Sequence, residues 1–197
     1  MRVYAATKNP GKLRELREIA APYGIAIETW DAYADPEETA DSYAGNAAIK
    51  ARALHGQLAA AGVRAPVLAD DSGLEISALG GRPGVHSARY AGAHATWPER
   101  RAEILREVAA SGSEDRGARF VCVVCYIDAA GAEIYAEGIV GGELTRDERG
   151  ELGFGYDPIF YEPSEHATFA QLSEKQKNSI SHRAKAVHEL VGKLETS

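Results

Sequence analysis

The chain has 197 residues, which predicts a single domain spanning residues 1–197. Its 45% hydrophobic content is enough for a core without metal or disulfide cross-links, so global disorder is excluded. Its 22 Lys and Arg against 29 Asp and Glu give a net charge of −7, which argues against nucleic acid as a partner because backbone binding needs a clustered basic surface. No stretch approaches the roughly 20 apolar residues of a membrane span, so no membrane role is expected.

The two cysteines, Cys122 and Cys125, are too few for the disulfide framework of a secreted protein. The N-terminal segment has no signal-peptide apolar core before Lys8, and we therefore expect a cytoplasmic protein. The C-x-x-C spacing lies in an apolar strand pattern, where positions i and i+3 point to opposite faces. This spacing argues against a metal or redox site.

In the first half of the chain, short apolar runs alternate with helical spacing. Residues 2–7 predict a strand, and the polar turn 8–11 leads into a helix for which Gly24 suits the C-terminal cap. A second strand is predicted over 25–30, an acidic loop over 31–41, a helix over 42–61 and a strand over 66–69.

In the second half, a Gly/Pro-rich loop over 80–84 precedes a helix that Thr96 and Glu99 announce by capping-box spacing. Strands over 118–128 and 132–140 flank a short turn and predict a hairpin, and the last helix is predicted over 181–194. The fold class is therefore α/β, a mixed twisted sheet with flanking helices. Its strand order cannot be derived from these patterns.

A candidate anion site lies where the first strand ends and the first helix begins. Free backbone N–H groups and the helix dipole favour an anion there, and Thr7, Asn9 and Lys12 add donors and a positive charge. A helix cap beside a surface lysine accounts for the same residues.

Four carboxylates, Glu37, Glu38, Asp70 and Asp71, form a second candidate set. Mg²⁺ takes one or two protein carboxylates and completes its shell with water and phosphate oxygens. Because Asp70 and Asp71 follow an apolar run, we expect them at the C-terminal end of a strand, where open α/β sheets commonly bind ligands. The alternative for Asp70-Asp71-Ser72-Gly73 is an acidic turn.

Basic and aromatic residues gather near the C-terminus. Lys175, Lys177, His182 and Arg183 form a donor patch able to bind a phosphate or a base carbonyl, or else a solvated start of the last helix. The segment 153–158 holds Phe154 and Tyr156 between glycines, which suits base stacking or plain core packing.

Five blocks in order, ATKNPGK, NAAIKA, LADDSGLEISALGGRPGVHSARYAG, GFGYDPIF and SISHRAKA, closely resemble the inosine/xanthosine triphosphate pyrophosphatase family. The resemblance spans almost the whole chain. It implies a homodimer whose protomer has two lobes around a central nucleotide-binding cleft. It also implies a Mg²⁺-dependent hydrolysis of ITP, dITP and XTP to the monophosphate and pyrophosphate, which removes deaminated purines from the nucleotide pool.

The resemblance also implies residue roles. Asp71 matches the proton acceptor and a metal ligand, and Glu37 matches the second metal ligand, although Glu38 fits a slightly different alignment. The substrate-binding positions are Thr7, Lys8, Asn9, Pro10, Gly11, Lys12, Ser72, Phe154, Gly155, Tyr156, Asp157, Lys177, His182 and Arg183.

These roles agree with the chemistry of the substrate. Hypoxanthine and xanthine present a carbonyl acceptor at the six-position, whereas adenine presents an amino donor, so Lys177, Arg183 and a protonated His182 favour the deaminated bases. Guanine keeps the carbonyl, and these residues do not explain its rejection.

Gly45 departs from the family pattern, because a glutamate usually stands there before Asn46. If that glutamate organises the metal, Gly45→Glu should lower the Mg²⁺ concentration that gives half-maximal rate. The departure also leaves open a nucleotide-binding regulator that does not hydrolyse its ligand. A Maf-like pyrophosphatase acting on other nucleotides is a separate alternative.

Overall fold

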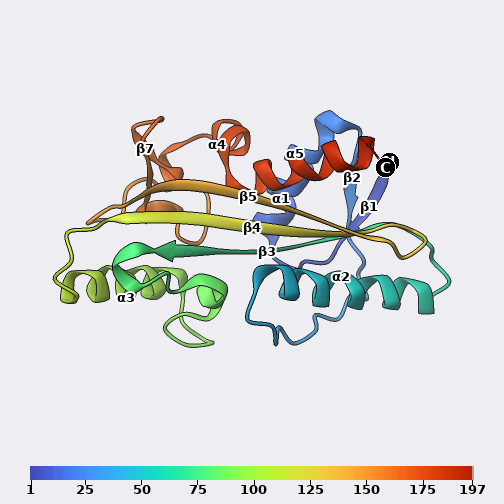
Figure 1. Cartoon of the computed structure of the whole chain (residues 1–197), viewed down its shortest axis with the longest axis horizontal. Helices are drawn as coiled ribbons and strands as arrows, with labels where there is room; N and C mark the ends of the chain where they lie inside the picture. The colour runs from blue at the N-terminus through green and yellow to red at the C-terminus, as the bar shows by residue number, and fades with distance from the viewer. Residues whose placement is uncertain (197) are drawn as a thin grey trace. The chain divides into compact units, whose positions relative to one another are not determined.

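The computed structural model describes residues 1–196 (Figure 1). The helices are α1 (Pro10–Ala20), α2 (Tyr43–Ala60), α3 (Trp97–Ala110), α4 (Glu174–Ile180) and α5 (His182–Glu195). The strands are β1 (Arg2–Ala5), β2 (Ala26–Glu28), β3 (Val67–Ile76), β4 (Gly117–Ile127), β5 (Glu133–Leu144), β6 (Phe160–Glu162) and β7 (Ala167–Thr168). No helix among residues 1–196 is long and apolar enough to cross a membrane.

The strands form one sheet in the order β2-β1-β3-β4-β5-β6-β7. β1 pairs in parallel with β2 and with β3, whereas β6 pairs antiparallel with β5 and with β7. The sheet is therefore mixed and carries flanking helices, which confirms the predicted fold class. The predicted hairpin strands are β4 and β5, which are neighbours in the sheet.

Contacts divide the chain into two compact units. The first comprises residues 1–71, 122–138 and 181–196, and the second comprises Ser72–Val121 and Ile139–Ile180. Strands β3, β4 and β5 contribute to both units. The interpretation of residues 1–197 as one domain stays a prediction.

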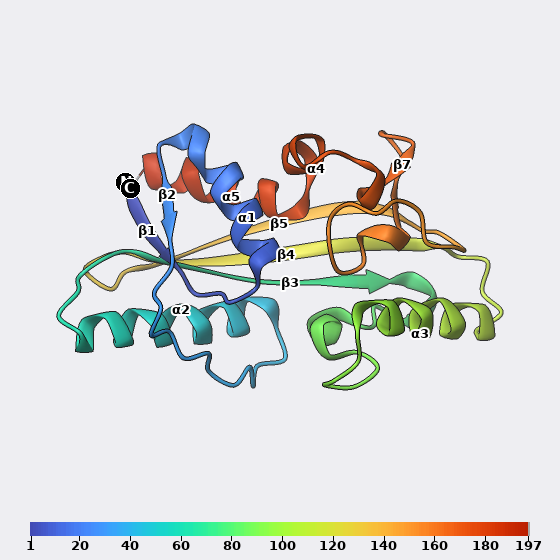
Figure 2. The ribbon, with the colours of Figure 1, turned by 180° about the vertical axis from the view of Figure 1, so that it is seen from behind.

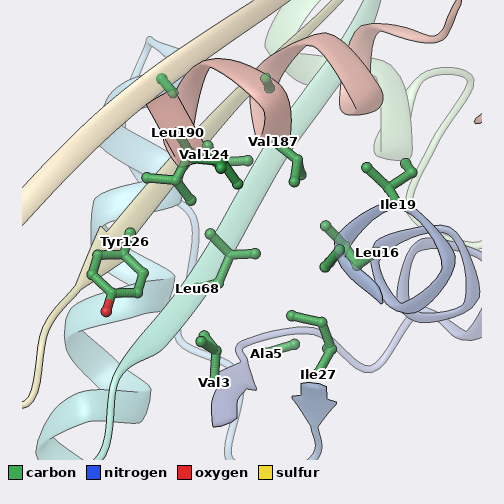
Figure 3. Packing of buried hydrophobic residues seen from close by; sticks show 14 of the residues in the cluster. Val3, Ala5, Leu16, Ile19, Ile27, Leu68, Val124, Tyr126, Val187 and Leu190 are labelled. Carbon is green, nitrogen blue, oxygen red and sulfur yellow. The ribbon is translucent and has the colours of Figure 1, made fainter. Parts of the chain in front are cut away.

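In the first unit, α2 covers one face of the sheet, and α1 and α5 cover the other (Figures 1 and 2). Leu16 of α1 and Val187 of α5 pack with Val124 of β4 on one side (Figure 3). On the other side, Leu54 and other α2 residues pack against the sheet. Cys122 and Cys125 belong to these two different clusters, which confirms that they point to opposite faces.

In the second unit, α3 contributes Ile104 and Val108 to a core that also holds three phenylalanines. The rings of Phe120, Phe160 and Phe169 lie with centroids 4.6 to 5.8 Å apart. The helix begins as predicted, because the Thr96 hydroxyl and the Glu99 carboxylate form a reciprocal capping box.

The structure corrects one expectation about the acidic motif. Asp70, Asp71, Ser72 and Gly73 do not end a strand or form a turn, because they lie within the ten-residue strand β3. It is β1 that ends, since its pairing with β3 stops at Ala5 opposite Leu68. Asp70 therefore lies just past the end of the neighbouring strand. Asp, Ser and Gly favour turns, but the ion pairs of Asp70 with Lys12 and of Asp71 with Lys50 outweigh that preference.

Three other elements differ from the sequence-based expectation. The helix α4 and the short strands β6 and β7 were not predicted, because each has too few residues for a periodic pattern to show.

Gly24 does not cap α1 itself. A 3₁₀ turn follows that helix, and Gly24 ends the turn with a φ of 68°.

Candidate functional site

The β1–α1 turn satisfies much of its own hydrogen bonding. The Asn9 Oδ1 atom accepts bonds from the backbone N–H groups of Gly11 at 2.9 Å and Lys12 at 3.2 Å, and the Thr7 hydroxyl accepts from the Asn9 N–H at 3.1 Å. Pro10 starts α1, where its missing N–H is harmless. Asn9 is thus the helix cap, and an incoming anion would compete with it for these two N–H groups.

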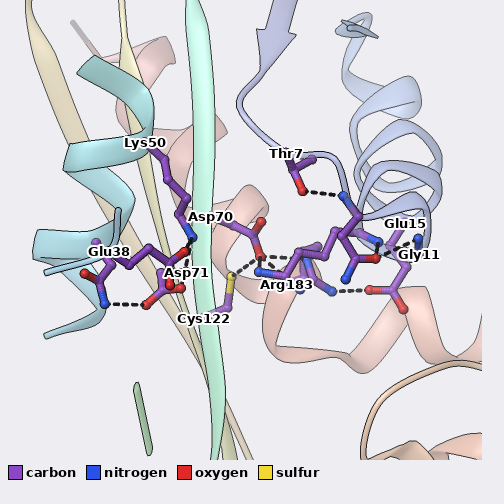
Figure 4. A network of polar contacts seen from close by, with 12 residues as sticks. Thr7, Gly11, Glu15, Glu38, Lys50, Asp70, Asp71, Cys122 and Arg183 are labelled. Atoms are coloured by element: carbon purple, nitrogen blue, oxygen red, sulfur yellow. Dashed lines mark hydrogen bonds and ion pairs between the residues drawn. The ribbon is translucent and has the colours of Figure 1, made fainter. Parts of the chain in front are cut away.

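A buried chain of ion pairs follows from this turn (Figure 4). The Lys12 ammonium lies 3.1 Å from Asp70 Oδ2, and the Arg183 guanidinium donates to the same oxygen from Nη2 at 2.9 Å. Arg183 also donates to Glu15 on α1. Arg183 is only 1% exposed, and Asp70 and Glu15 are buried carboxylates of the first unit. The contact of Arg183 with a base stays a prediction.

Asp71 lies beside a second cation, Lys50 of α2 (Figure 4). The Lys50 ammonium is 3.0 Å from Asp71 Oδ1 and 2.8 Å from Glu38 Oε1, so it joins two carboxylates. The Asn46 amide nitrogen reaches the other oxygen of Asp71 at 3.4 Å. Asn46 and Lys50 are four residues apart and therefore share one face of the helix.

Neighbouring aspartates have opposite pKa shifts. Burial raises the pKa of Asp71, and the nearby Lys50 and Lys12 charges only partly oppose this. Burial would also raise the pKa of Asp70, but Lys12 and Arg183 outweigh it and hold that pKa well below its ordinary value. A pair of carboxylates whose environments push their pKa values apart can divide two tasks, and Asp71 suits the proton acceptor.

The acidic loop places its two glutamates differently. Glu38 contacts Lys50 and so lies near Asp71, whereas Glu37 is exposed. No group of three or more His, Cys, Asp or Glu residues within residues 1–196 could hold a metal ion by itself. Two carboxylate oxygens do converge on one ammonium, however, and Mg²⁺ typically needs only one or two protein carboxylates.

The second unit has a buried ion pair of its own. Asp157 and Lys177 are 2% and 4% exposed, and the Lys177 ammonium donates to Asp157 Oδ2. The same carboxylate oxygen accepts the Phe154 N–H at 2.7 Å, and the Lys177 ammonium lies 4.7 Å from the Phe154 ring centroid. Lys177 is therefore no solvated surface cation. A half-buried aromatic ring and a fixed ammonium lie together.

Two other residues of this segment have evident structural functions. Gly153 has a φ of 72°, and a Cβ there would lie 2.1 Å from Asp157 Oδ2, so the position needs glycine. Tyr156 is 3% exposed, its hydroxyl donates to the Ser87 carbonyl at 2.7 Å, and its ring meets Trp97 edge-on. Of the two aromatics, Phe154 is the one left for stacking.

The structure divides the predicted site residues between the units. The first unit holds Thr7, Lys8, Asn9, Pro10, Gly11, Lys12, Glu37, Asp70, Asp71, His182 and Arg183, and the second holds Ser72, Phe154, Gly155, Tyr156, Asp157 and Lys177. His182 is buried at the start of α5, and Lys8 is exposed and pairs with Asp35.

Sequence reasoning missed Glu15, Asn46 and Lys50, all of which are buried beside charged site residues. A signal for two of them was present, because the NAAIKA block places Asn46 and Lys50 at i and i+4. For Glu15 the signal was a charge beside Leu16 and Ile19 on the apolar face of α1.

A family model described as the Ham1 family matches residues 3–193. The chain belongs to the Ham1 family. This result confirms the resemblance drawn from the five sequence blocks.

Relatives in the Ham1 family match along nearly their whole length. A Geobacillus kaustophilus protein named dITP/XTP pyrophosphatase is 42% identical over 191 residues, which cover 95% of this chain and 91% of that protein. A Thermus thermophilus protein of the same name is 45% identical over 194 residues, or 97% of this chain and 90% of that protein. The solved structure of a HAM1 protein from Coxiella burnetii superimposes with a TM-score of 0.88 at 39% identity, covering 100% of both chains.

Proposed function

We propose that this chain is a nucleoside triphosphate pyrophosphohydrolase that converts dITP, ITP and XTP to the monophosphate and pyrophosphate. The observation that carries the proposal is Asp71, a buried carboxylate of raised pKa held beside the Lys50 ammonium. The names of the relatives, dITP/XTP pyrophosphatase, support the substrate class.

In the proposed reaction Asp71 accepts a proton from a water molecule, and the water oxygen attacks the α-phosphorus. The bond between the α-phosphorus and the α,β-bridging oxygen breaks, and pyrophosphate leaves with that oxygen. Lys12 and Lys50 carry the positive charge that the triphosphate needs. An ammonium has three N–H donors, so Lys12 can stay paired with Asp70, and Lys50 with Glu38 and Asp71, while each binds a phosphate oxygen.

We propose Mg²⁺ as the cofactor, held by Glu38 and Asp71. The support is that oxygens of both carboxylates already lie within 3.0 Å of one cation, the Lys50 ammonium. A bound Mg²⁺ would neutralise charge that develops on the phosphates. Glu37, the ligand favoured by the sequence, is the alternative, and comparing Mg²⁺ titrations of Glu37→Gln and Glu38→Gln distinguishes the two.

For the base, we propose that Phe154 provides a stacking surface and that Lys177 donates to the carbonyl at the six-position. Asp157 positions both, since its carboxylate binds the Lys177 ammonium and the Phe154 N–H. Adenine offers an amino group instead of this carbonyl, so ATP would give the Lys177 ammonium no acceptor at the six-position.

The proposal is tested by incubating the protein with Mg²⁺ and, separately, ITP, dITP, XTP, GTP, ATP and dTTP, and by resolving monophosphate plus pyrophosphate from diphosphate plus orthophosphate. We expect pyrophosphate from the first three and little from ATP. Preference for dTTP would support the Maf-like alternative. Nucleotide binding without turnover would support the regulator alternative, which Gly45 motivates.

We also propose that the enzyme acts in the cytoplasm as a homodimer. Both cysteines are free and buried, which suits a reducing compartment. The dimer follows from the family resemblance, and light scattering at micromolar concentration tests it, with a monomeric mass as the contrary result.

A further inference from the structure

Asn46 connects two parts of the first unit that carry the carboxylates. Its side chain is fully buried in the first turn of α2. The amide oxygen accepts the backbone N–H of Ala40 at 3.0 Å, and the amide nitrogen reaches Asp71 Oδ2 at 3.4 Å. Ala40 is two residues after Glu38, so one side-chain amide links the acidic loop to the strand that holds Asp71.

The chemistry of the two partners fixes the orientation of this amide. A backbone N–H can only donate, so it must meet the amide oxygen, and an ionised carboxylate can only accept, so it must meet the amide nitrogen. Asn is the residue of this size that offers one acceptor and one donor. Aspartate would face Asp71 with a second carboxylate, and an apolar residue would leave the half-buried N–H of Ala40 without this acceptor.

Lys50 completes the arrangement one helical turn later. Asn46 contacts one oxygen of Asp71, and Lys50 contacts the other oxygen together with Glu38. Glu38 lies on the acidic loop and Asp71 lies on β3. Both carboxylates can therefore contact the same cation only if the loop stays at a fixed distance from β3. Hydrogen bonds that orient metal-binding carboxylates are worth about 10–100-fold in metal affinity or activity.

We infer that Asn46 is a positioning residue, whose amide holds the acidic loop against Asp71 so that Glu38 and Asp71 bind one cation. The inference rests on the proposed function for its effect on catalysis. Its structural half, that Asn46 anchors the loop at Ala40, stands independently.

Two variants separate the bonds of this amide. Asn46→Asp keeps an acceptor for the Ala40 N–H but turns the donor that faces Asp71 into a carboxylate, whereas Asn46→Ala removes both bonds. We expect both variants to raise the half-saturating Mg²⁺ concentration for ITP hydrolysis about 10–100-fold. We expect the KM for ITP at saturating Mg²⁺ to change far less. Mn²⁺ binding, followed by electron paramagnetic resonance with an α,β-methylene analogue of ITP, should weaken in parallel.

Gln57→Ala is the matched control. Gln57 anchors the same loop at another point, since its amide makes both an acceptor and a donor bond, each of 2.9 Å, with the backbone of Ala34. These two bonds go to the loop backbone and not to Asp71. We expect Gln57→Ala to leave the Mg²⁺ dependence unchanged.

Hydrogen exchange of the Ala40 amide tests the structural half without any substrate. Protection should be lost in Asn46→Ala and kept in Asn46→Asp. The inference is overturned if Ala40 stays protected in Asn46→Ala, if Asn46→Asp titrates with Mg²⁺ as the parent does, or if Gln57→Ala shifts the titration equally. If Asn46→Ala does not fold, the Mg²⁺ titration of Asn46→Asp decides whether Asn46 positions the two carboxylates. If the parent protein releases no pyrophosphate from ITP, the proposed function fails, and the exchange result alone decides the anchoring by Asn46.

Discussion

In the first unit, Lys12, Asp70, Arg183 and Glu15 form a continuous chain of buried ion pairs, whereas in the second unit Lys177 and Asp157 form a single buried pair beside Phe154. The first arrangement brings charges of both signs near Asp71 and shifts pKa values in opposite directions. The second fixes one ammonium at the face of an aromatic ring.

Under the proposed function, we expect the first arrangement to act on the phosphates and the second to recognise the base. Substitutions in the charged chain of the first unit should affect every nucleotide alike, because phosphates are common to all. Substitutions at the Lys177 pair should change the ratio between nucleotides, because only the base differs.

The largest effect is expected for Asp71→Asn, which removes the proposed proton acceptor. We expect kcat for ITP, dITP and XTP to fall about 10²–10⁴-fold and by the same factor for each. Pyrophosphate release measures it. Asp31→Asn, an exposed neutralisation in the acidic loop, is the control and should leave kcat unchanged. Full turnover in Asp71→Asn would remove the proposed mechanism.

Next in size is Asp70→Asn, which leaves the buried Arg183 and the half-buried Lys12 with one carboxylate fewer. Breaking a buried pair from one side costs about 3–5 kcal/mol of the free energy of unfolding. Burial alone would raise the pKa of Asp70, but the charges of Lys12 and Arg183 outweigh burial and hold this pKa below its ordinary value. The ionised Asp70 therefore stabilises the folded protein above the unfolded-state pKa near 3.9. This stabilisation is lost progressively as the pH falls below that value.

Urea unfolding at pH 7 and at acidic pH measures this linkage. The difference between parent and Asp70→Asn should be large at pH 7 and should shrink as the solution is acidified. Asp147→Asn removes an exposed carboxylate and serves as the control. A difference that does not depend on pH would contradict the assigned shift.

The second unit is tested by Lys177→Met combined with Asp157→Asn, which removes the pair without leaving a lone buried charge. Because a hydrogen bond to a charged group contributes about 1.5–3 kcal/mol, the preference for ITP over ATP in kcat/KM should fall about tenfold to a hundredfold. Lys175→Met, an exposed lysine of the same helix α4, is the control. An equal loss for both nucleotides would place Lys177 with the chemistry instead.

Gly138 tests how α5 is seated on the first unit. A Cβ at Gly138 would lie 2.0 Å from the His182 carbonyl oxygen and 2.4 Å from the Ala186 nitrogen, both backbone atoms. Gly138→Ala should therefore displace the start of α5 and cost about 1–3 kcal/mol of the free energy of unfolding. Gly141→Ala on the same strand meets nothing within 4 Å and should be nearly neutral in thermal unfolding. Equal effects would show that the close approach is not needed.

Local patterns predicted the parts of the molecule that local chemistry determines. The turn before α1, the capping box of α3 and the opposite orientations of Cys122 and Cys125 all follow from neighbouring residues. The bounds of α2, Tyr43–Ala60, lie within one residue of the prediction for the same reason.

The rest depends on contacts between distant segments. Asp70 and Asp71 continue a strand because cations from α1, α2 and α5 pair with them, and no local pattern contains that information. Arg183 pairs with Glu15 across 168 positions of the chain, so its burial could not be predicted from its basic neighbours. The choice between Glu37 and Glu38 likewise depends on Lys50.

The smallest effect concerns Gly45, where the sequence alone predicts that Gly45→Glu lowers the Mg²⁺ requirement. A Cβ at Gly45 would lie 2.5 Å from Ala40 Cβ, so this substitution by itself must displace the loop that carries Glu38. We therefore expect Gly45→Glu alone to raise the half-saturating Mg²⁺ concentration. Combined with Ala40→Gly, which removes the obstructing Cβ, it should lower that concentration about two- to fivefold, as expected for a partly exposed charge worth up to about 1 kcal/mol. Ala40→Gly alone is the control, and a double variant that titrates like that control would refute the idea that a carboxylate at position 45 assists the metal.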